Sequence, residues 1–340
     1  MFRRPAHSLP RSLTLDLIVR RLFPTPPGPE VVADFKRHVR ETGQPETWPK
    51  ISTDCPPVEG EVVMLDKDIG INVKLRPGQT MAPCAICLPK GPKWKNAGSL
   101  IWCEATSAVY CIGPDCSTGE MKTKLAQARN ILARTEKDKR DTARLIAAAT
   151  SAPLFVRWID DHLDLALSVS HRHNDFARSL PKFRSALSRF ARTGLPGDLL
   201  GAPGAGVFVK GKAFLTGGWR LDNDLQSARA RLQRLAAEAS PDPATWGKAL
   251  APTARDDMLK SVDEAIKLVY RAADRMIAAS VFLSDDTFGF LGRLRSHPLA
   301  PTSYTLNFTK TSAAIDHREE RWRGALALEM PNPLPSDQRT

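Results

Sequence analysis

Residues 255–283 read RDDMLKSVDEAIKLVYRAADRMIAASVFL, and apolar or small side chains recur there every three or four positions. That period matches one face of an α-helix and not the alternation of a strand. The pattern therefore predicts a long helix that either packs at the centre of a domain or forms a homo-oligomer with a second copy of itself. The recurring side chains are Met258, Val262, Ala265, Val269, Ala273, Met276 and Ser280.

Most of the remaining helical signal lies earlier in the chain. Residues 29–42 form an amphipathic stretch, and a Ser-x-x-Glu capping box at 117–120 starts a helix that runs to about residue 135. After a charged run at 136–141, further helices are predicted at 151–179, 181–193 and 224–237. The predicted fold class is mainly α, with helical bundles on both sides of a joint rich in Gly and Pro.

Short strands interrupt the helical pattern. Residues 62–65 and 71–75 predict one β-hairpin, residues 99–103 and 108–110 a second, and residues 207–209 and 213–215 a third. These signals divide the chain into segments of different character. The predicted segments are 1–58 (basic and Pro-rich), 59–135 (hairpin and cysteine module), 136–194 (helical), 195–218 (joint), 219–330 (C-terminal helical domain) and 331–340 (loose tail).

The composition indicates a globular, basic protein. The chain has 340 residues, 42% of them apolar, and a formal net charge of +12. Such a surface attracts polyanions, although many basic proteins bind none. No run approaches the roughly 18 apolar residues that a membrane-spanning helix needs, so we expect no membrane partner. Residues 1–23 resemble an organelle transit peptide in composition, but the prolines there favour a basic amphipathic helix of the mature protein.

The cysteines are clustered in a way that favours metal binding over disulfides. Five of the six lie between positions 84 and 116. A C-x2-C turn can point two thiolates at one ion, and a second pair completes a tetrahedral zinc site. We therefore predict a structural Zn²⁺ and a reducing, cytoplasmic location. The predicted ligands are Cys84, Cys87, Cys111 and Cys116, with Cys103 as the alternative to Cys111.

The segment 81–135 resembles the small treble-clef and zinc-ribbon-like modules. The residues that carry the resemblance are the Cys84-x2-Cys87 knuckle and the turn Cys111-Ile112-Gly113-Pro114-Asp115-Cys116. The second pair departs from the usual spacing, because four residues separate its cysteines. The resemblance implies a zinc-binding insertion with a closed thiolate shell and no single activity.

Basic side chains near the knuckle and on two helices predict a surface for nucleic acid. A Trp flanked by lysines can stack on a base while the ammonium groups meet phosphates. The other interpretation is that Trp94 covers a small core and the lysines are only solvated. The predicted contact residues are Lys90, Lys93, Trp94, Lys95, Lys122, Lys124, Lys182 and Arg189.

No motif of a known catalytic class is present. Residues 206–213 almost match a phosphate-binding loop, but Ala213 lacks the hydroxyl that would hold magnesium. Asp161, Asp164, His171 and Asp175 share a helical face and could bind a divalent metal, although such stripes are more often solvated. We therefore predict a zinc-dependent, non-enzymatic nucleic-acid-binding protein. The alternatives are an assembly protein in which zinc only stabilises a small domain, and a metal-dependent enzyme.

Overall fold

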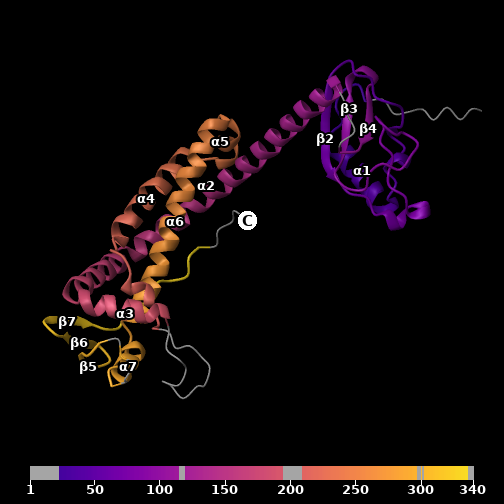
Figure 1. Ribbon diagram of the computed structural model, residues 1–340. Coiled ribbons are helices and arrows are strands. Elements are labelled where there is room, and N and C mark those ends of the chain that lie inside the picture. Colours follow the sequence, from indigo (N-terminus) through magenta and orange to yellow (C-terminus); the bar gives the residue numbers. More distant parts are fainter. Residues whose placement is uncertain (1–22, 115–118, 194–208, 297–299, 301, 336–340) are drawn as a thin grey trace, which may run out of the picture. The chain divides into compact units, whose positions relative to one another are not determined.

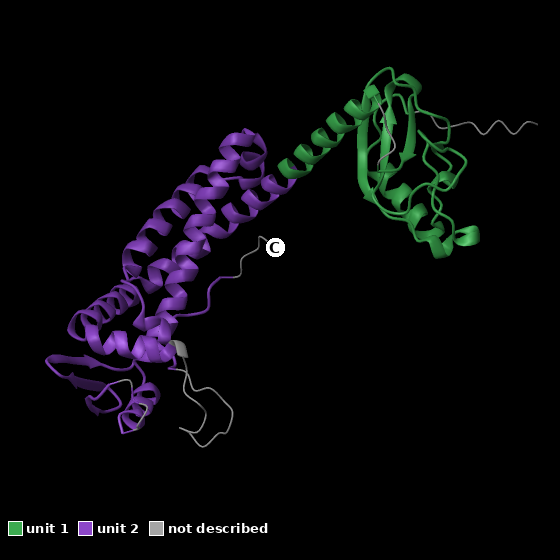
Figure 2. Cartoon of the chain, in the orientation of Figure 1, with its two compact units in different colours: residues 1–138 green, residues 139–340 purple. Residues whose placement is uncertain are grey.

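The computed structural model describes residues 23–114, 119–193, 209–296, 300 and 302–335 (Figure 1). The chain divides into two compact units, residues 1–138 and 139–340 (Figure 2). Within the described residues there are seven α-helices and two small sheets, so the prediction of a mainly α fold is confirmed. The predicted N-terminal helix at 1–23 lies almost entirely outside the described residues.

The first unit is built on a four-stranded sheet in the order β1-β4-β3-β2. β1 (Ile51–Ser52) runs parallel to β4, and the other neighbours are antiparallel. The bounds of the others are Val62–Ile69 for β2, Gly98–Cys103 for β3 and Ala108–Ile112 for β4. Every residue of β3 and β4 is buried, which explains why these strands read as continuous apolar runs. The core of this unit lies around them.

Two sequence predictions in this unit are confirmed and one is wrong. α1 (Pro29–Thr42) has the predicted bounds, and β3 pairs with β4 as predicted. The first hairpin does not form, because β2 continues to Ile69 and pairs with β3, while Val73–Leu75 is a 3-10 helix. Asp66 stays in the strand since its carboxylate pairs with Lys36 at 2.8 Å.

α2 (Gly119–Ser179) is one continuous helix of 61 residues that begins in the first unit and ends in the second. The prediction that a second helix starts near Pro153 is therefore wrong. Pro153 lacks the N–H that would bond to the preceding turn. Beside it, the hydroxyls of Thr150 and Ser151 bond to the carbonyls of Ile146 and Ala148, at 2.9 and 3.2 Å. Neither hydroxyl bonds to the carbonyl of Ala149, which would accept from an N–H at position 153, and the helix nevertheless continues through the proline.

The second unit is a helical bundle in which α4 (Leu221–Glu238) and α6 (Pro252–Phe282) lie beside α2 (Figure 1). α3 (Pro181–Thr193), α5 (Pro243–Ala249) and the short 3-10 helix η6 (Lys212–Leu215) complete it. Val262 and Val269 on α6 are buried inside the unit. The predicted helix at 255–283 is therefore a central packing helix, and this face is not available to a second copy.

A second sheet closes one end of this unit and was not predicted from the sequence. β5 (Thr305–Phe308), β6 (Ser312–His317) and β7 (Glu320–Ala325) form an antiparallel meander after α7 (Asp285–Leu294). Trp322 of β7 packs edge-on against Phe176 of α2, with ring centroids 5.2 Å apart. This aromatic contact attaches the sheet to the bundle. No helix among the described residues is long and apolar enough to cross a membrane.

Candidate functional site

Among the described cysteines of the predicted zinc module, no three are grouped closely enough to hold a metal ion. Cys84 is buried and its sulfur accepts a bond from the N–H of Gly113 at 3.3 Å, whereas Cys87 is exposed. Cys111 lies on β4 near Cys84, but Cys103 on β3 is paired with Ala108 and not with Cys111. Cys116 lies outside the described residues. Of the predicted ligands that the structure describes, Cys84 and Cys111 are therefore buried in the core, whereas Cys87 is on the surface.

The treble-clef prediction is contradicted. In the part of the chain that the structure describes, no three side chains of His, Cys, Asp or Glu are placed to hold a metal ion. Burial raises the pKa of the Cys103 thiol to about 12, and burial together with the nearby Cys84 raises the pKa of Cys111. Because a raised pKa keeps these groups as thiols at neutral pH, they behave as small apolar core residues.

Trp94 belongs to the core of the first unit. Its side chain is 3% exposed, its Nε1–H donates to the carbonyl of Pro83 at 2.6 Å, and its ring packs on Gly98. The ring has no free face on which a base could stack, so the interpretation that Trp94 covers a core holds. The flanking lysines, Lys90, Lys93 and Lys95, are exposed.

The two predicted lysines at the start of α2 differ in their surroundings. Lys122 is exposed. Lys124 is half-buried, and its ammonium group donates to the carbonyls of Val58 and Gly60, at 2.7 and 2.9 Å. Lys124 therefore ties α2 to the loop before β2, and it is less available to an anion than the sequence suggested.

The second unit places the predicted basic helix α3 in a defined orientation. Phe183, Leu187 and Ala191 on one face of α3 are buried, while Phe190 is partly buried. At its N-terminus the carboxylate of Glu320 accepts bonds from the backbone N–H groups of Lys182 and Phe183, at 2.9 and 3.1 Å. Lys182 and Arg189 are exposed on the opposite side. Residues 176–193 include no Asp or Glu, so the exposed face of α3 is positively charged.

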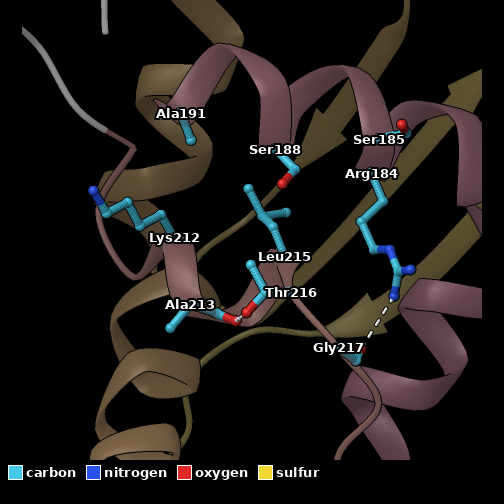
Figure 3. A pocket seen from close by; sticks show the side chains of 9 residues that line it. All are labelled: Arg184, Ser185, Ser188, Ala191, Lys212, Ala213, Leu215, Thr216 and Gly217. Carbon is cyan, nitrogen blue, oxygen red and sulfur yellow. Dashed lines mark hydrogen bonds between the residues drawn. The ribbon is translucent and has the colours of Figure 1, made fainter. Parts of the chain in front are cut away.

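A pocket of about 530 Å³ lies between α3 and η6, and we call it the α3 pocket (Figure 3). Arg184 stands at one side of it and its Nη1 reaches the carbonyl of Gly217 at 3.5 Å. Lys212 stands at the other side, and Ser185, Ser188 and Thr216 supply hydroxyls. Among the described residues, those that line the pocket include no carboxylate; they are Arg184, Ser185, Ser188, Ala191, Lys212, Ala213, Leu215, Thr216 and Gly217.

The η6 wall of this pocket differs from the sequence prediction. Ala213–Leu215 was predicted as a strand, but it belongs to the 3-10 helix Lys212–Leu215, and residues 207 and 208 lie outside the described residues. Gly211 precedes η6 with φ +64°, and a Cβ there would meet the carbonyl of Ala278 and lie 2.7 Å from the backbone N of Phe282. This close approach to α6 sets the position of Lys212 and Thr216. No sequence pattern indicates that these residues line a pocket together with α3.

Comparison of the chain with protein-family models, with curated proteins and with solved structures finds no match.

The Asp/His stripe on α2 forms no metal site among the described residues. Asp161, Asp164 and His171 are exposed, and Asp175 is half-buried. The histidines that sequence reasoning missed are the buried ones. The ring of His173 stacks on Trp219 with centroids 4.4 Å apart, and His162 lies against Trp158 in the same way at 4.3 Å. Because both histidines pack against tryptophans, they are not candidates for a functional site. We therefore take the α3 pocket as the candidate site.

Proposed function

We propose that this protein binds nucleic acid without catalysing a reaction on it, and that the α3 pocket holds a phosphate of the nucleic-acid backbone. The observation that carries the proposal is that Arg184 and Lys212 line opposite sides of one pocket, together with three hydroxyl-bearing side chains and, among its described lining residues, no carboxylate (Figure 3). Guanidinium, ammonium and hydroxyl groups are the side chains that most often meet backbone phosphates. A volume of about 530 Å³ is sufficient for one nucleotide.

The surroundings of the pocket extend the positive surface beyond one phosphate. Lys182 and Arg189 lie on the same helix as Arg184 and are exposed. A backbone that follows α3 would therefore meet further cations at its next phosphates. Such contacts release counterions from the nucleic acid, which makes binding strong at low salt and weak at high salt.

The contact surface we propose differs from the one that the sequence favoured. None of the described residues that line the α3 pocket is aromatic, and Trp94 is buried, so we expect no base stacking at either place. Binding should then depend on phosphates and not on base identity. We expect little difference in affinity between oligonucleotides of the same length and different sequence.

The proposal is tested by fluorescence anisotropy of a labelled single-stranded oligonucleotide over a series of salt concentrations. The double variant Arg184→Gln/Lys212→Gln should weaken binding about tenfold or more, and should reduce the slope of log K against log salt by about 1 for each lost phosphate contact. A matched control is Arg157→Gln/Arg234→Gln, which removes the same charge from exposed positions on α2 and α4.

The control variant should bind almost as well as the unaltered chain. An equal loss in both double variants would show that only net charge matters and would overturn the assignment of the α3 pocket. The absence of binding at low salt would overturn the proposed function itself.

A further inference from the structure

The second unit contains another pocket, which we call the arginine pocket, and it shares no lining residue with the α3 pocket. Its volume is about 590 Å³. Three arginines from two elements line it: Arg220 directly before α4, and Arg271 and Arg275 one turn apart on α6. Asn174 of α2, Trp219 and Asp224 complete the wall.

The charges in this pocket are unbalanced. Among the described residues that line it, Asp224 is the only carboxylate, and its oxygen lies 4.0 Å from Arg275. Within the described residues, the guanidinium group of neither Arg220 nor Arg271 makes an ion pair or hydrogen bond. Three guanidinium groups and one carboxylate leave a charge of about +2, because arginine stays protonated at every physiological pH. Like charges one helical turn apart repel each other, so this arrangement favours an anion.

The floor of the arginine pocket is rigid. The ring of Trp219 is 1% exposed and lies parallel to the ring of His173. Its Nε1–H donates to the carbonyl of Thr216 at 3.1 Å, and its own carbonyl accepts from the amide of Asn174 at 3.1 Å. The guanidinium of Arg275 lies over the same indole, 5.5 Å from the ring centroid. This stacking holds Arg275 in place before any ligand arrives.

Neither the imidazole of His173 nor the indole of Trp219 adds charge to the pocket or offers a surface on which a base could stack. Burial lowers the pKa of His173, so its imidazole is neutral at neutral pH. Trp219 is covered and cannot receive a base. The pocket can therefore recognise a compact anion through its guanidinium groups.

We propose that the arginine pocket is a second binding site, specific for a phosphate group that carries two negative charges. A free phosphate ion and a terminal phosphate monoester are both close to −2 at pH 8, which matches the surplus charge of the pocket. A carboxylate or an internal phosphodiester carries −1 and would leave one guanidinium without a partner. Planar guanidinium forks also match phosphate oxygens in pairs. This inference goes beyond the proposed function and does not depend on it.

The test is calorimetric titration of the full chain with inorganic phosphate at about pH 8. Arg271→Gln should weaken binding about tenfold, whereas Asp224→Asn should tighten it several-fold, because the only opposing carboxylate is removed. Arg234→Gln on α4 is the control and should change nothing, since Arg234 does not line the pocket. Circular dichroism verifies that each variant is folded.

The source of the phosphate is distinguished in the same experiment. An oligonucleotide with a 5′-phosphate that binds more tightly than its unphosphorylated form, with the difference lost in Arg271→Gln, would assign the pocket to a nucleic-acid end. Phosphate binding without that difference would assign it to a free phosphate or a small monoester. No binding of inorganic phosphate, or equal affinity for acetate, would overturn the proposal.

Discussion

The backbone N–H of Asn332 donates a hydrogen bond to Nε2 of His162 at 3.0 Å, although the two residues are 170 positions apart. Nδ1 of His162 lies 2.7 Å from the carbonyl of Trp158, and the indole N–H of Trp158 donates to the carbonyl of Asn332 at 3.0 Å. Because a carbonyl can only accept and an N–H can only donate, the proton of this imidazole is on Nδ1. The predicted loose tail is therefore fixed to α2 at this point.

Replacing His162 should release the end of the chain. His162→Phe keeps an aromatic ring against Trp158 but removes the acceptor of the Asn332 N–H and the donor to the Trp158 carbonyl. We expect the free energy of unfolding to fall by about 1–3 kcal/mol, the usual effect of leaving such groups unpaired. Urea denaturation measures the loss, and limited proteolysis should show faster cleavage between residues 326 and 335.

Asn332→Ala provides the matched control, because both bonds of Asn332 use its backbone. Its stability and cleavage rate should be nearly those of the unaltered chain. A loss in Asn332→Ala as large as in His162→Phe would contradict the assigned bonds.

The cap of α3 by Glu320 should make stability depend on pH in the acid range. Burial alone raises the pKa of Glu320, but the N–H groups of Phe183 and Lys182 and the ring of His317 outweigh it and lower the pKa below the ordinary 4.5. Since the folded pKa is the lower one, the contribution is complete above pH 4.5 and is lost as the pH falls through the folded value. Glu320→Gln should cost about 1 kcal/mol near neutral pH.

The neighbouring Glu319 is exposed and serves as the control for this cap. Glu319→Gln should leave both the stability and its pH dependence almost unchanged. Urea denaturation should be measured from pH 3 to pH 7. Above about pH 5 the midpoint of Glu320→Gln should lie below those of the unaltered chain and of Glu319→Gln, and the difference should disappear as the pH falls. Parallel curves over the whole range would show that the carboxylate charge does not act at α3.

Local sequence signals predicted the fold wherever one short motif determined an element. α1 begins at Pro29 and ends before Gly43, whose φ of +68° is the left-handed conformation that commonly ends a helix. α3 likewise begins at Pro181. α2 was divided wrongly, because a proline commonly starts or ends a helix, whereas this helix continues through Pro153.

The candidate site depends on long-range packing, and the sequence predicted only half of it. Arg184 could be placed on the polar side of α3 from its period, but Lys212 lines the same pocket only because Gly211 allows η6 to approach α6. The cysteine spacing was misleading for a related reason. β4 continues through Cys111 to Ile112, so that thiol points into the sheet core and not toward an ion.

The five described cysteines should differ sharply in reactivity. Cys55 and Cys87 are exposed, whereas Cys103 and Cys111 are buried and have raised pKa values. A thiol that titrates near 12 instead of 9 holds about a thousandth of the thiolate at a given neutral pH. Iodoacetamide followed by peptide mapping should therefore label Cys55 and Cys87 first.

Labelling in concentrated urea is the control, since all cysteines should then react at similar rates. The same burial predicts alkaline instability: Cys103 stabilises the fold fully below pH 9, and this contribution is lost as the pH rises toward about 12. Equal labelling of Cys87 and Cys103 in the native chain would contradict the described sheet core.

Gly211 provides the sharpest test of how the α3 pocket is assembled. A side chain at this position would combine the strain of a positive φ, about 1–2 kcal/mol, with a collision against the backbone of α6 at Ala278 and Phe282. Gly211→Ala should therefore cost about 3 kcal/mol or more and displace η6, so that oligonucleotide affinity falls together with stability. Gly217 has nearly the same φ, +65°, but nothing lies within 4 Å of its Cβ position. Gly217→Ala should thus cost only the backbone strain, and a loss of stability equal to that of Gly211→Ala, measured by urea denaturation, would show that contact with α6 does not position η6.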